Sequence, residues 1–225
     1  EDLMSVGGEY TDLVKLGFGT SLITPDVERK IEIYRKAGAI PYLGGTLFEA
    51  FIIRDMFAEF IELLDGYGIE MVEVSDGSFD IDHKKKLEYI SILAKRGKVI
   101  SEVGSKKKEV VYKPEQWVEM MKSELGAGSV KVIAEARESG TTGIYNEDGS
   151  INNEIIDAIS KHVKLENVIW EAPLKSQQAW FIKHFGANVN LGNIAPDEII
   201  SLEALRLGLR GDTFFQFLPA ELKDQ

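Results

Sequence analysis

Charged side chains follow several of the apolar segments in this sequence that have the composition of buried strands. In residues 98–108, KVISEVGSKKK, Glu102 lies within an apolar strand, and a Gly-Ser turn leads from that strand to three consecutive lysines. Three adjacent lysines usually mark a solvated loop, but other strands end in the same way. Their ends carry Lys15, Glu73, Asp76, Glu135, Arg137, Glu138, Glu171, Asn190 and Asn193. Such side chains, collected at the carboxyl ends of parallel strands, would form one site that could bind a hard cation and an anion.

Alternation along each strand decides which of these side chains share a face of the sheet. It directs Glu73, Glu135 and Glu171 to the same side as Lys15. Carboxylates that meet in one place repel one another unless they are protonated, paired with cations or bound to a metal. Two arrangements therefore stay open, a metal site and a set of salt bridges to lysines and arginines without a metal.

The metal that such a site favours follows from its donor atoms. The chain has no cysteine, and its three histidines, His83, His162 and His184, fall in expected helices and read as surface or packing residues. Oxygen donors alone favour Mg²⁺ over Zn²⁺. Local positive charge is available from Lys15, Lys106, Arg137, Lys175 and Arg210. Basic groups beside Mg²⁺ ligands suit a small phosphorylated carboxylate as substrate.

The overall composition limits the class of protein. With 225 residues, of which 44% are hydrophobic, the chain can bury a sizeable core, and we expect residues 1–225 to form a single domain. The net charge of −11 argues against nucleic acid and anionic membranes as partners, because both require a basic face. No apolar run reaches membrane-spanning length, and the absence of cysteine is compatible with a reducing compartment. We therefore expect a cytoplasmic protein.

The elements that must position the charged residues alternate regularly along the chain. The expected strands are residues 11–16, 40–43, 69–74, 98–103, 130–136, 168–171 and 188–191. Helices are expected between them, and the first of these has Thr24 as its N-cap. A division near Arg54 is expected within the helical residues 47–64, and Asp80 or Asp82 is expected to cap the helix that follows the third strand.

Continuous apolar strands that alternate with helices indicate a parallel sheet covered by helices. A (β/α)₈ TIM barrel has eight strands, and the sequence shows seven. Because residues 1–8 read as the end of a helix, we expect the missing first strand upstream of residue 1. A doubly wound open sheet is the alternative, but it usually concentrates ligand contacts at one switch point. Polar residues at the ends of nearly all the strands favour the closed barrel.

Eight motifs, taken in order, connect the sequence to a known family. LGFGTSLI, GGTLFE, VEVSDGS, SEVGSK, AEARESG, EAPLKSQQ, VNLGNIA and SLEALRLGLRGDTF resemble the phosphosulfolactate synthase family in order and spacing, over essentially the whole chain. The resemblance implies a TIM-barrel fold and the Mg²⁺-dependent addition of sulfite to phosphoenolpyruvate. The product of such enzymes serves coenzyme M biosynthesis in methanogens and sulfolactate formation in some spore-forming bacteria.

The resemblance attaches a role to one lysine, and the other roles are expected from the charged strand ends. It places the general-acid lysine of the family, in the SEVGSK motif, on Lys106, which we expect to protonate the substrate, with Glu102 beside it. The residues from which the Mg²⁺ ligands are expected to come are Glu73, Asp76, Glu102, Glu135 and Glu171. The residues expected to bind the phosphate, carboxylate or sulfite are Lys15, Arg137, Lys175, Asn190 and Arg210.

One departure and two alternatives accompany the resemblance. Family members begin with a further strand that ends in an Asp-Lys-Gly-type turn, which this chain lacks. A barrel without that strand would expose two sheet edges. A non-catalytic, stress-associated relative is one alternative function, and another Mg²⁺-dependent lyase or aldolase acting on phosphoenolpyruvate-like acids is the second. Because barrels of this type often associate through helix faces, we also expect a homo-oligomer.

Overall fold

The computed structural model describes residues 1–104, 112–137 and 139–223, and its centre is one parallel sheet. The seven strands are β1 (Leu13–Leu16), β2 (Ile40–Leu43), β3 (Met71–Val74), β4 (Lys98–Val103), β5 (Ser129–Ala134), β6 (Val168–Glu171) and β7 (Leu191–Gly192). Each strand pairs in parallel with the next strand along the chain. All the strands therefore end at the same edge of the sheet.

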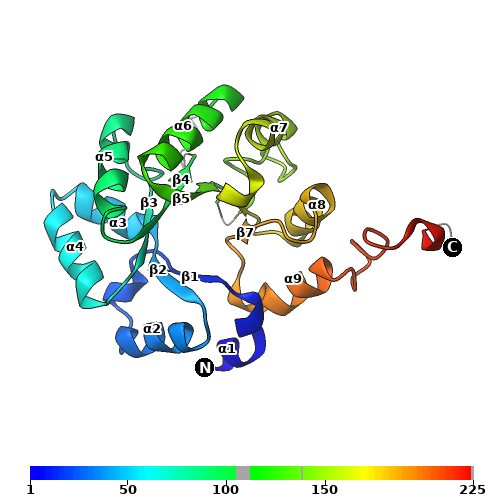
Figure 1. Ribbon diagram of the computed structural model, residues 1–225, viewed down its shortest axis with the longest axis horizontal. Coiled ribbons are helices and arrows are strands. Elements are labelled where there is room, and N and C mark those ends of the chain that lie inside the picture. The colour runs from blue at the N-terminus through cyan, green and yellow to red at the C-terminus, as the bar shows by residue number, and fades with distance from the viewer. Residues whose placement is uncertain (105–111, 138, 224–225) are drawn as a thin grey trace.

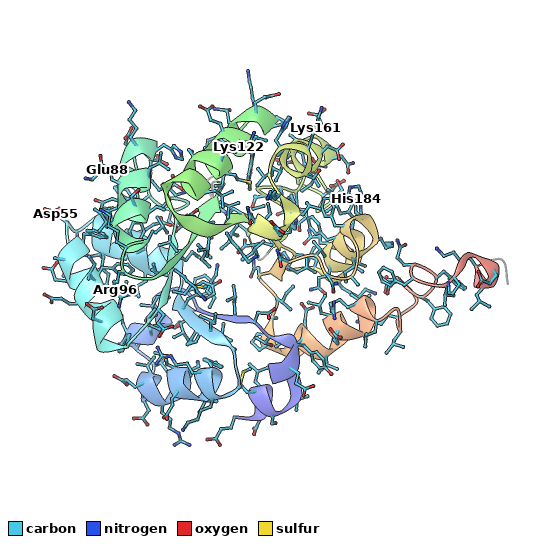
Figure 2. All side chains as sticks on the ribbon, in the orientation of Figure 1. Asp55, Glu88, Arg96, Lys122, Lys161 and His184 are labelled. Carbon is cyan, nitrogen blue, oxygen red and sulfur yellow. The ribbon has the colours of Figure 1, made fainter. Side chains whose placement is uncertain are left out.

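Helices connect the strands and surround the sheet (Figure 1). They are α1 (Asp2–Gly7), α2 (Val27–Lys36), α3 (Gly45–Ile52), α4 (Phe57–Gly66), α5 (His83–Leu93), α6 (Pro114–Ala127), α7 (Asn153–His162), α8 (Lys175–Phe185) and α9 (Ile199–Arg206). Charged side chains such as Glu88, Lys122 and Lys161 extend from the outer helix surfaces (Figure 2). Among the helices of the described residues, none is sufficiently long and apolar to cross a membrane.

Two-residue alternation along the strands separates the core into layers. Tyr42, Met71, Ile100, Ile133 and Ile169 come from five successive strands and pack against one another in one cluster. Residues from five neighbouring strands can meet in this way only if the sheet curls around them. The intervening strand residues face outward and join larger clusters with the surrounding helices, which contain most of the buried aromatic side chains.

The curled sheet confirms the predicted parallel β/α architecture but not a complete barrel. Strand order β1 to β7 follows the sequence, so the order reversal of a doubly wound sheet is absent from the described residues. Within those residues, β1 and β7 each pair with a single strand, and no strand joins them. On this side of the molecule α1 lies beside α9, where a β-carbon added to Gly7 would lie 3.0 Å from Ile199 (Figure 1). Seven strands fit the predicted absence of the first strand.

Two local predictions have different outcomes. The division of residues 47–64 is confirmed, because α3 ends at Ile52, α4 begins at Phe57, and Asp55 between them has a φ of 56°. The prediction that Thr24 is an N-cap is wrong. A short 3₁₀ turn precedes this residue, so the Thr24 hydroxyl donates to the carbonyl oxygen of Thr20 at 2.7 Å instead.

Candidate active site

A ring of charged side chains occupies the carboxyl ends of the strands. Lys15, Glu73, Glu102, Glu135 and Glu171 follow, at a distance of two residues, the inward apolar residues Leu13, Met71, Ile100, Ile133 and Ile169. The same alternation that fills the interior with apolar side chains therefore turns these charged groups inward at the next position. All four carboxylates are buried, with exposed fractions of 1–4%.

Among the described residues, Lys15 contributes positive charge to this ring. Its Nζ lies 2.9 Å from Oε2 of Glu73, 3.5 Å from Oε1 of Glu171 and 3.9 Å from Oε2 of Glu102. Burial by itself would lower the pKa of Lys15, but the neighbouring carboxylates, Glu73 foremost, raise it well above its usual value. Lys15 therefore carries its proton at all pH values at which the protein would be used.

Glu73 is held from two sides. Its Oε2 pairs with Lys15, and its Oε1 accepts a hydrogen bond of 2.7 Å from the backbone N–H of Gly45 at the start of α3. A β-carbon at position 45 would lie 2.2 Å from the Ser75 hydroxyl and 2.9 Å from the Glu73 carboxylate. Only glycine at position 45 lets the helix start approach the carboxylate this closely.

Glu171 is a buried carboxyl group with a raised pKa. Its Oε2 accepts a hydrogen bond of 2.8 Å from the backbone N–H of Ala136. Burial raises the pKa of Glu171 to about 7, Lys15 opposes this shift, and the nearby carboxylates of Glu102 and Glu73 add to it. A carboxyl group with this pKa changes charge near neutral pH, so a cation beside it would change its protonation state.

Glu102, Glu135 and Glu171 together form a candidate cation site. One carboxylate oxygen of each lies within 4.8 Å of the corresponding oxygens of the other two, and all three residues are buried. Within the described part of the chain, these three residues form the group of acidic side chains whose oxygens lie close enough together to hold one metal ion. Three buried oxygen donors at the carboxyl edge of the sheet fit a hard ion such as Mg²⁺.

The other predicted ligand, Asp76, has a different environment. Its Oδ1 lies 2.8 Å from the ammonium of Lys86, which is fully buried between α5 and the sheet. Asp76 is therefore not part of the Glu102, Glu135 and Glu171 group.

The predicted basic residues lie in several places. Lys106 lies outside the described residues. Arg137 follows Glu135 by two residues and is half-buried beyond the end of β5. Lys175 begins α8, and its ammonium lies 2.9 Å from Oδ2 of Asp212. The hydrogen bond from Lys175 is the main cause of the lowered pKa of Asp212, and the charge of Arg210 lowers this pKa further. Lys175 and Arg210 therefore share one acidic neighbour.

Asn190 does not reach the site. We expected it at the carboxyl end of the last strand, but β7 begins one residue later. The Asn190 side-chain amide donates to the carbonyl oxygens of Glu166 at 3.2 Å and Val168 at 3.0 Å, beside the start of β6. Asn193 lies at the opposite end of β7, where its amide donates to the carbonyl oxygen of Ala136 at 3.3 Å.

Two buried residues near the site were missed in the sequence. Glu49 on α3 accepts hydrogen bonds from the hydroxyl of Ser75 and from the backbone N–H groups of Ser78 and Phe79, so it holds the loop after β3. Lys86 reaches the same loop from α5. Its helical spacing could have identified it, because Lys86 precedes the buried residues Ile90 and Leu93 by four and seven positions.

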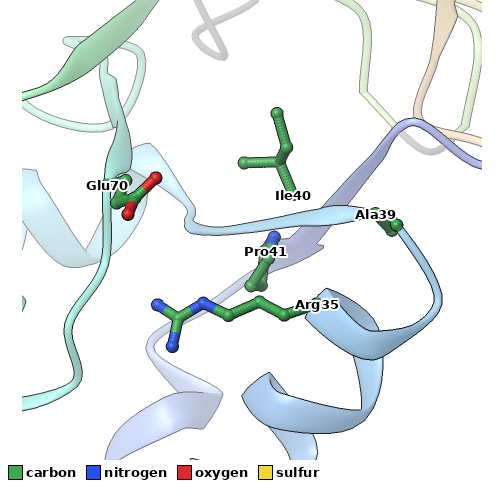
Figure 3. Close-up of a pocket in the computed structure, with 6 residues that line it drawn as sticks. Arg35, Ala39, Ile40, Pro41 and Glu70 are labelled. Carbon is green, nitrogen blue, oxygen red and sulfur yellow. The ribbon is translucent and has the colours of Figure 1, made fainter.

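A separate cavity lies at the other end of the strands (Figure 3). It has a volume of about 230 Å³ and is lined by Arg35, Gly38, Ala39, Ile40, Pro41 and Glu70. These residues lie at the amino ends of β2 and β3, where Arg35 and Glu70 are exposed. This cavity does not share residues with the carboxylate ring.

A sequentially ordered, curled parallel sheet with charged residues at its carboxyl edge defines the class of barrel-like β/α enzymes. The fold is similar to the crystal structure of a 3-hexulose-6-phosphate synthase, with a TM-score of 0.57 and 18% identity over 92% of this chain and 91% of that chain. At this identity the similarity establishes the fold alone.

Sequence comparison identifies the particular family. The model of the (2R)-phospho-3-sulfolactate synthase family matches residues 1–212. The phosphosulfolactate synthase of Methanocaldococcus jannaschii is 43% identical and covers 95% of this chain and 88% of its own length. The phosphosulfolactate synthase of Bacillus subtilis is 41% identical, covering 96% of this chain and 86% of its own length. The chain belongs to the phosphosulfolactate synthase family.

Proposed function

We propose that this protein adds sulfite to phosphoenolpyruvate and forms (2R)-phospho-3-sulfolactate in a Mg²⁺-dependent reaction. The observation that carries the proposal is the buried group of Glu102, Glu135 and Glu171 in a chain that belongs to this family. In the reaction, the sulfur of sulfite forms a bond with the methylene carbon of the substrate. The electron pair of the double bond moves toward the carboxylate, and C2 then takes up one proton.

The charge of the site explains the need for a divalent cation. Within the described residues, the ring combines four carboxylates with the ammonium of Lys15, whereas both substrates are anions. We assign Glu102, Glu135 and Glu171 as the Mg²⁺ ligands, with Glu73 held by Lys15 and Gly45 beside them. Bound there, Mg²⁺ would supply the positive charge that attracts the substrate carboxylate and stabilises negative charge developing on it.

The basic residues of the chain have separate roles in this proposal. Lys106 follows Glu102 by four positions in the sequence and donates the proton to C2. Lys15 keeps the carboxylates of Glu73 and Glu171 oriented. Arg137, two residues beyond Glu135 in the sequence, is a candidate for binding the substrate phosphate or carboxylate, as are Lys175 and Arg210.

The experiment that tests the function is direct detection of the product. Phosphoenolpyruvate and sulfite are incubated with the protein and Mg²⁺, and again with EDTA, using protein that includes any residues upstream of Glu1. We expect phosphosulfolactate, identified by NMR or mass spectrometry, with Mg²⁺ and not with EDTA. Absence of product from folded protein would reject the proposed reaction, and equal product in EDTA would reject the role of the metal. The cytoplasmic location also stays a prediction.

A further inference from the structure

Lys86 is a charged residue inside the protein that the proposed reaction does not use. It lies on the face of α5 that packs against the sheet, and its side chain is 1% exposed. Lysine is rarely buried to this extent unless its ammonium is fully paired. The neighbouring Lys85 on the same helix is exposed and pairs with exposed Glu88. The two adjacent lysines therefore have entirely different environments.

Three oxygen atoms surround the Lys86 ammonium at hydrogen-bond distance. Its Nζ lies 2.8 Å from Oδ1 of Asp76, 2.8 Å from Oε1 of Glu124 and 2.7 Å from the backbone carbonyl oxygen of Glu102. The ammonium donates hydrogen bonds to Asp76 and to the Glu102 carbonyl, and it forms an ion pair with the buried carboxylate of Glu124. Lys86 thus joins the loop after β3, helix α6 and the end of β4.

The contact with Glu102 occurs where two strands separate. The last paired residues of β3 and β4 are Val74 and Ser101, whereas β4 continues to pair with β5 through Val103. Glu102 therefore lies one residue beyond its last partner on the β3 side. We call this point the fork: beyond Ser101, β4 no longer pairs with β3 but still pairs with β5. Lys86 donates to the Glu102 carbonyl at the fork.

We propose that Lys86 is a positioning residue for Glu102. By holding the Glu102 carbonyl and Asp76 at the fork, Lys86 fixes the backbone from which the Glu102 side chain enters the ring. The direction of that side chain brings its carboxylate within 4.8 Å of those of Glu135 and Glu171. The consequence for catalysis rests on the proposed function, whereas the effect on the end of β4 does not.

A second anchor makes this fork rigid. Glu49 holds the loop after β3 from the side of α3, through Ser75, Ser78 and Phe79. Lys86 holds the same loop from the side of α5, through Asp76. Because Asp76 lies between the residues bound by Glu49, its carboxylate is a fixed partner for Lys86. Within the described residues, Lys86 differs from Glu49 because its ammonium also binds the Glu102 carbonyl on β4. Loss of the Lys86 ammonium therefore removes this contact with the end of β4.

The test compares three variants with the wild type. Lys86→Met keeps an unbranched side chain, one atom shorter than that of lysine, and removes its charge. If the unpaired Glu124 prevents folding, Lys86→Met combined with Glu124→Gln removes both charges from the interior. Lys85→Met makes the same chemical change one residue away, on the exposed side of α5, and serves as the matched control.

Hydrogen exchange of residues 98–104 provides a measurement that requires no substrate. We expect Lys86→Met to raise exchange at the end of β4 by about tenfold, because local opening there becomes easier. Lys85→Met is expected to leave it unchanged. Unchanged exchange in a folded Lys86 variant would overturn the proposal, whether or not the protein proves to be a synthase.

The binding of Mg²⁺, measured by calorimetry, tests whether Lys86 acts through Glu102. Loss of a group that orients a metal ligand typically weakens metal affinity by about 10- to 100-fold, which is the expected effect of Lys86→Met. The same substitution in a Glu102→Gln background is expected to have little further effect, as non-additivity requires for two residues that act together. Additive effects would show that Lys86 is merely structural. If the wild type binds no Mg²⁺, the metal assignment fails, and hydrogen exchange alone decides the role of Lys86.

Discussion

Lys15 supplies the charge that allows four carboxylates to share one end of the sheet. Its ammonium contacts three of them, and the fourth, Glu135, completes the group with Glu102 and Glu171. Since the neighbouring carboxylates raise the pKa of Lys15 well above its usual value, its ammonium keeps its charge at neutral pH. In the proposed reaction, the proton that C2 takes up comes from Lys106.

Replacement of Lys106 tests this assignment. We expect Lys106→Ala to lower kcat by about 100- to 10,000-fold, the usual contribution of a general acid, with fold and Mg²⁺ affinity retained. Steady-state kinetics, circular dichroism and calorimetry provide the three measurements. Lys108→Ala, two residues away in the sequence, is the control and is expected to keep kcat within a few-fold of the wild type. Near-normal turnover of Lys106→Ala would remove this lysine from the mechanism.

Glu171 makes a prediction about stability and pH. Mainly through burial, its pKa is raised from 4.5 to about 7. An acid whose pKa is higher in the folded state stabilises the fold while protonated, so this stabilisation is lost as pH rises from about 4.5 to about 7. In metal-free protein, Glu171 is expected to account for a loss on the order of 3 kcal/mol across this range. Urea denaturation at several pH values should show a smaller loss for Glu171→Gln.

The control for this measurement is Glu154→Gln, which alters an exposed glutamate on α7. Its unfolding free energy should follow the pH dependence of the wild type. If Glu171→Gln also followed the wild-type curve, the raised pKa would not be a property of Glu171.

At the scale of the elements, the start of α3 contacts the ring through its backbone. The N–H of Gly45 binds Glu73, and the favourable end of the helix dipole faces the carboxylate. Gly45→Ala would force the added methyl group against Ser75 and Glu73. We expect this substitution to destabilise the protein by about 1–3 kcal/mol, as overpacking does, and to reduce kcat.

Gly66 at the end of α4 offers the matched control for Gly45. It lies in a helix, and a β-carbon there would have no neighbour within 4 Å. Gly66→Ala is expected to leave stability unchanged or to raise it by about 0.5–1 kcal/mol through loss of backbone entropy in the unfolded chain. Chemical denaturation measures both variants, and equal effects would contradict the specific role of Gly45.

The elements also show what sequence reasoning could predict. The inward positions of Glu73, Glu135 and Glu171 followed from two-residue alternation, because a shift by one residue would turn the apolar residues of each strand away from the core. The place of Asn190 could not be derived in this way. The last strand has only two residues, so its limits depend on pairing with β6 and not on composition. Lys86 was hidden among three consecutive lysines, and only its helical spacing from Ile90 and Leu93 marks it as the inward one.

At the scale of the whole molecule, charge does not favour encounter with the substrates. The net charge of −11 would repel the two anionic substrates of the proposed reaction at long range. Binding therefore depends on local positive charge at the carboxyl edge of the sheet, within a few ångströms of the ring.

The C-terminal segment carries the remaining prediction, that of a homo-oligomer. After α9 the chain extends away from the helices that surround the sheet (Figure 1). It carries exposed apolar side chains at Leu207, Leu209, Phe214, Phe215, Phe217 and Leu222. The segment has a defined anchor, because the buried Thr213 donates from its hydroxyl to the carbonyl oxygen of Leu205 at 2.7 Å. We expect a second copy of the chain to cover this surface, since aromatic side chains often dominate interfaces.

Substitution of two of these aromatic residues tests this prediction. Light scattering coupled to size-exclusion chromatography should show an oligomer for the wild type and a shift toward monomer for the Phe214→Ser and Phe215→Ser double variant. The control combines Ile53→Ser and Ile92→Ser, at positions with exposed fractions of 56% and 45%, close to the 56% and 50% of Phe215 and Phe214. A monomeric wild type, or equal effects of the two double variants, would show that the C-terminal segment is not the interface. Because solubility changes would affect both variants alike, only a specific contact can separate them.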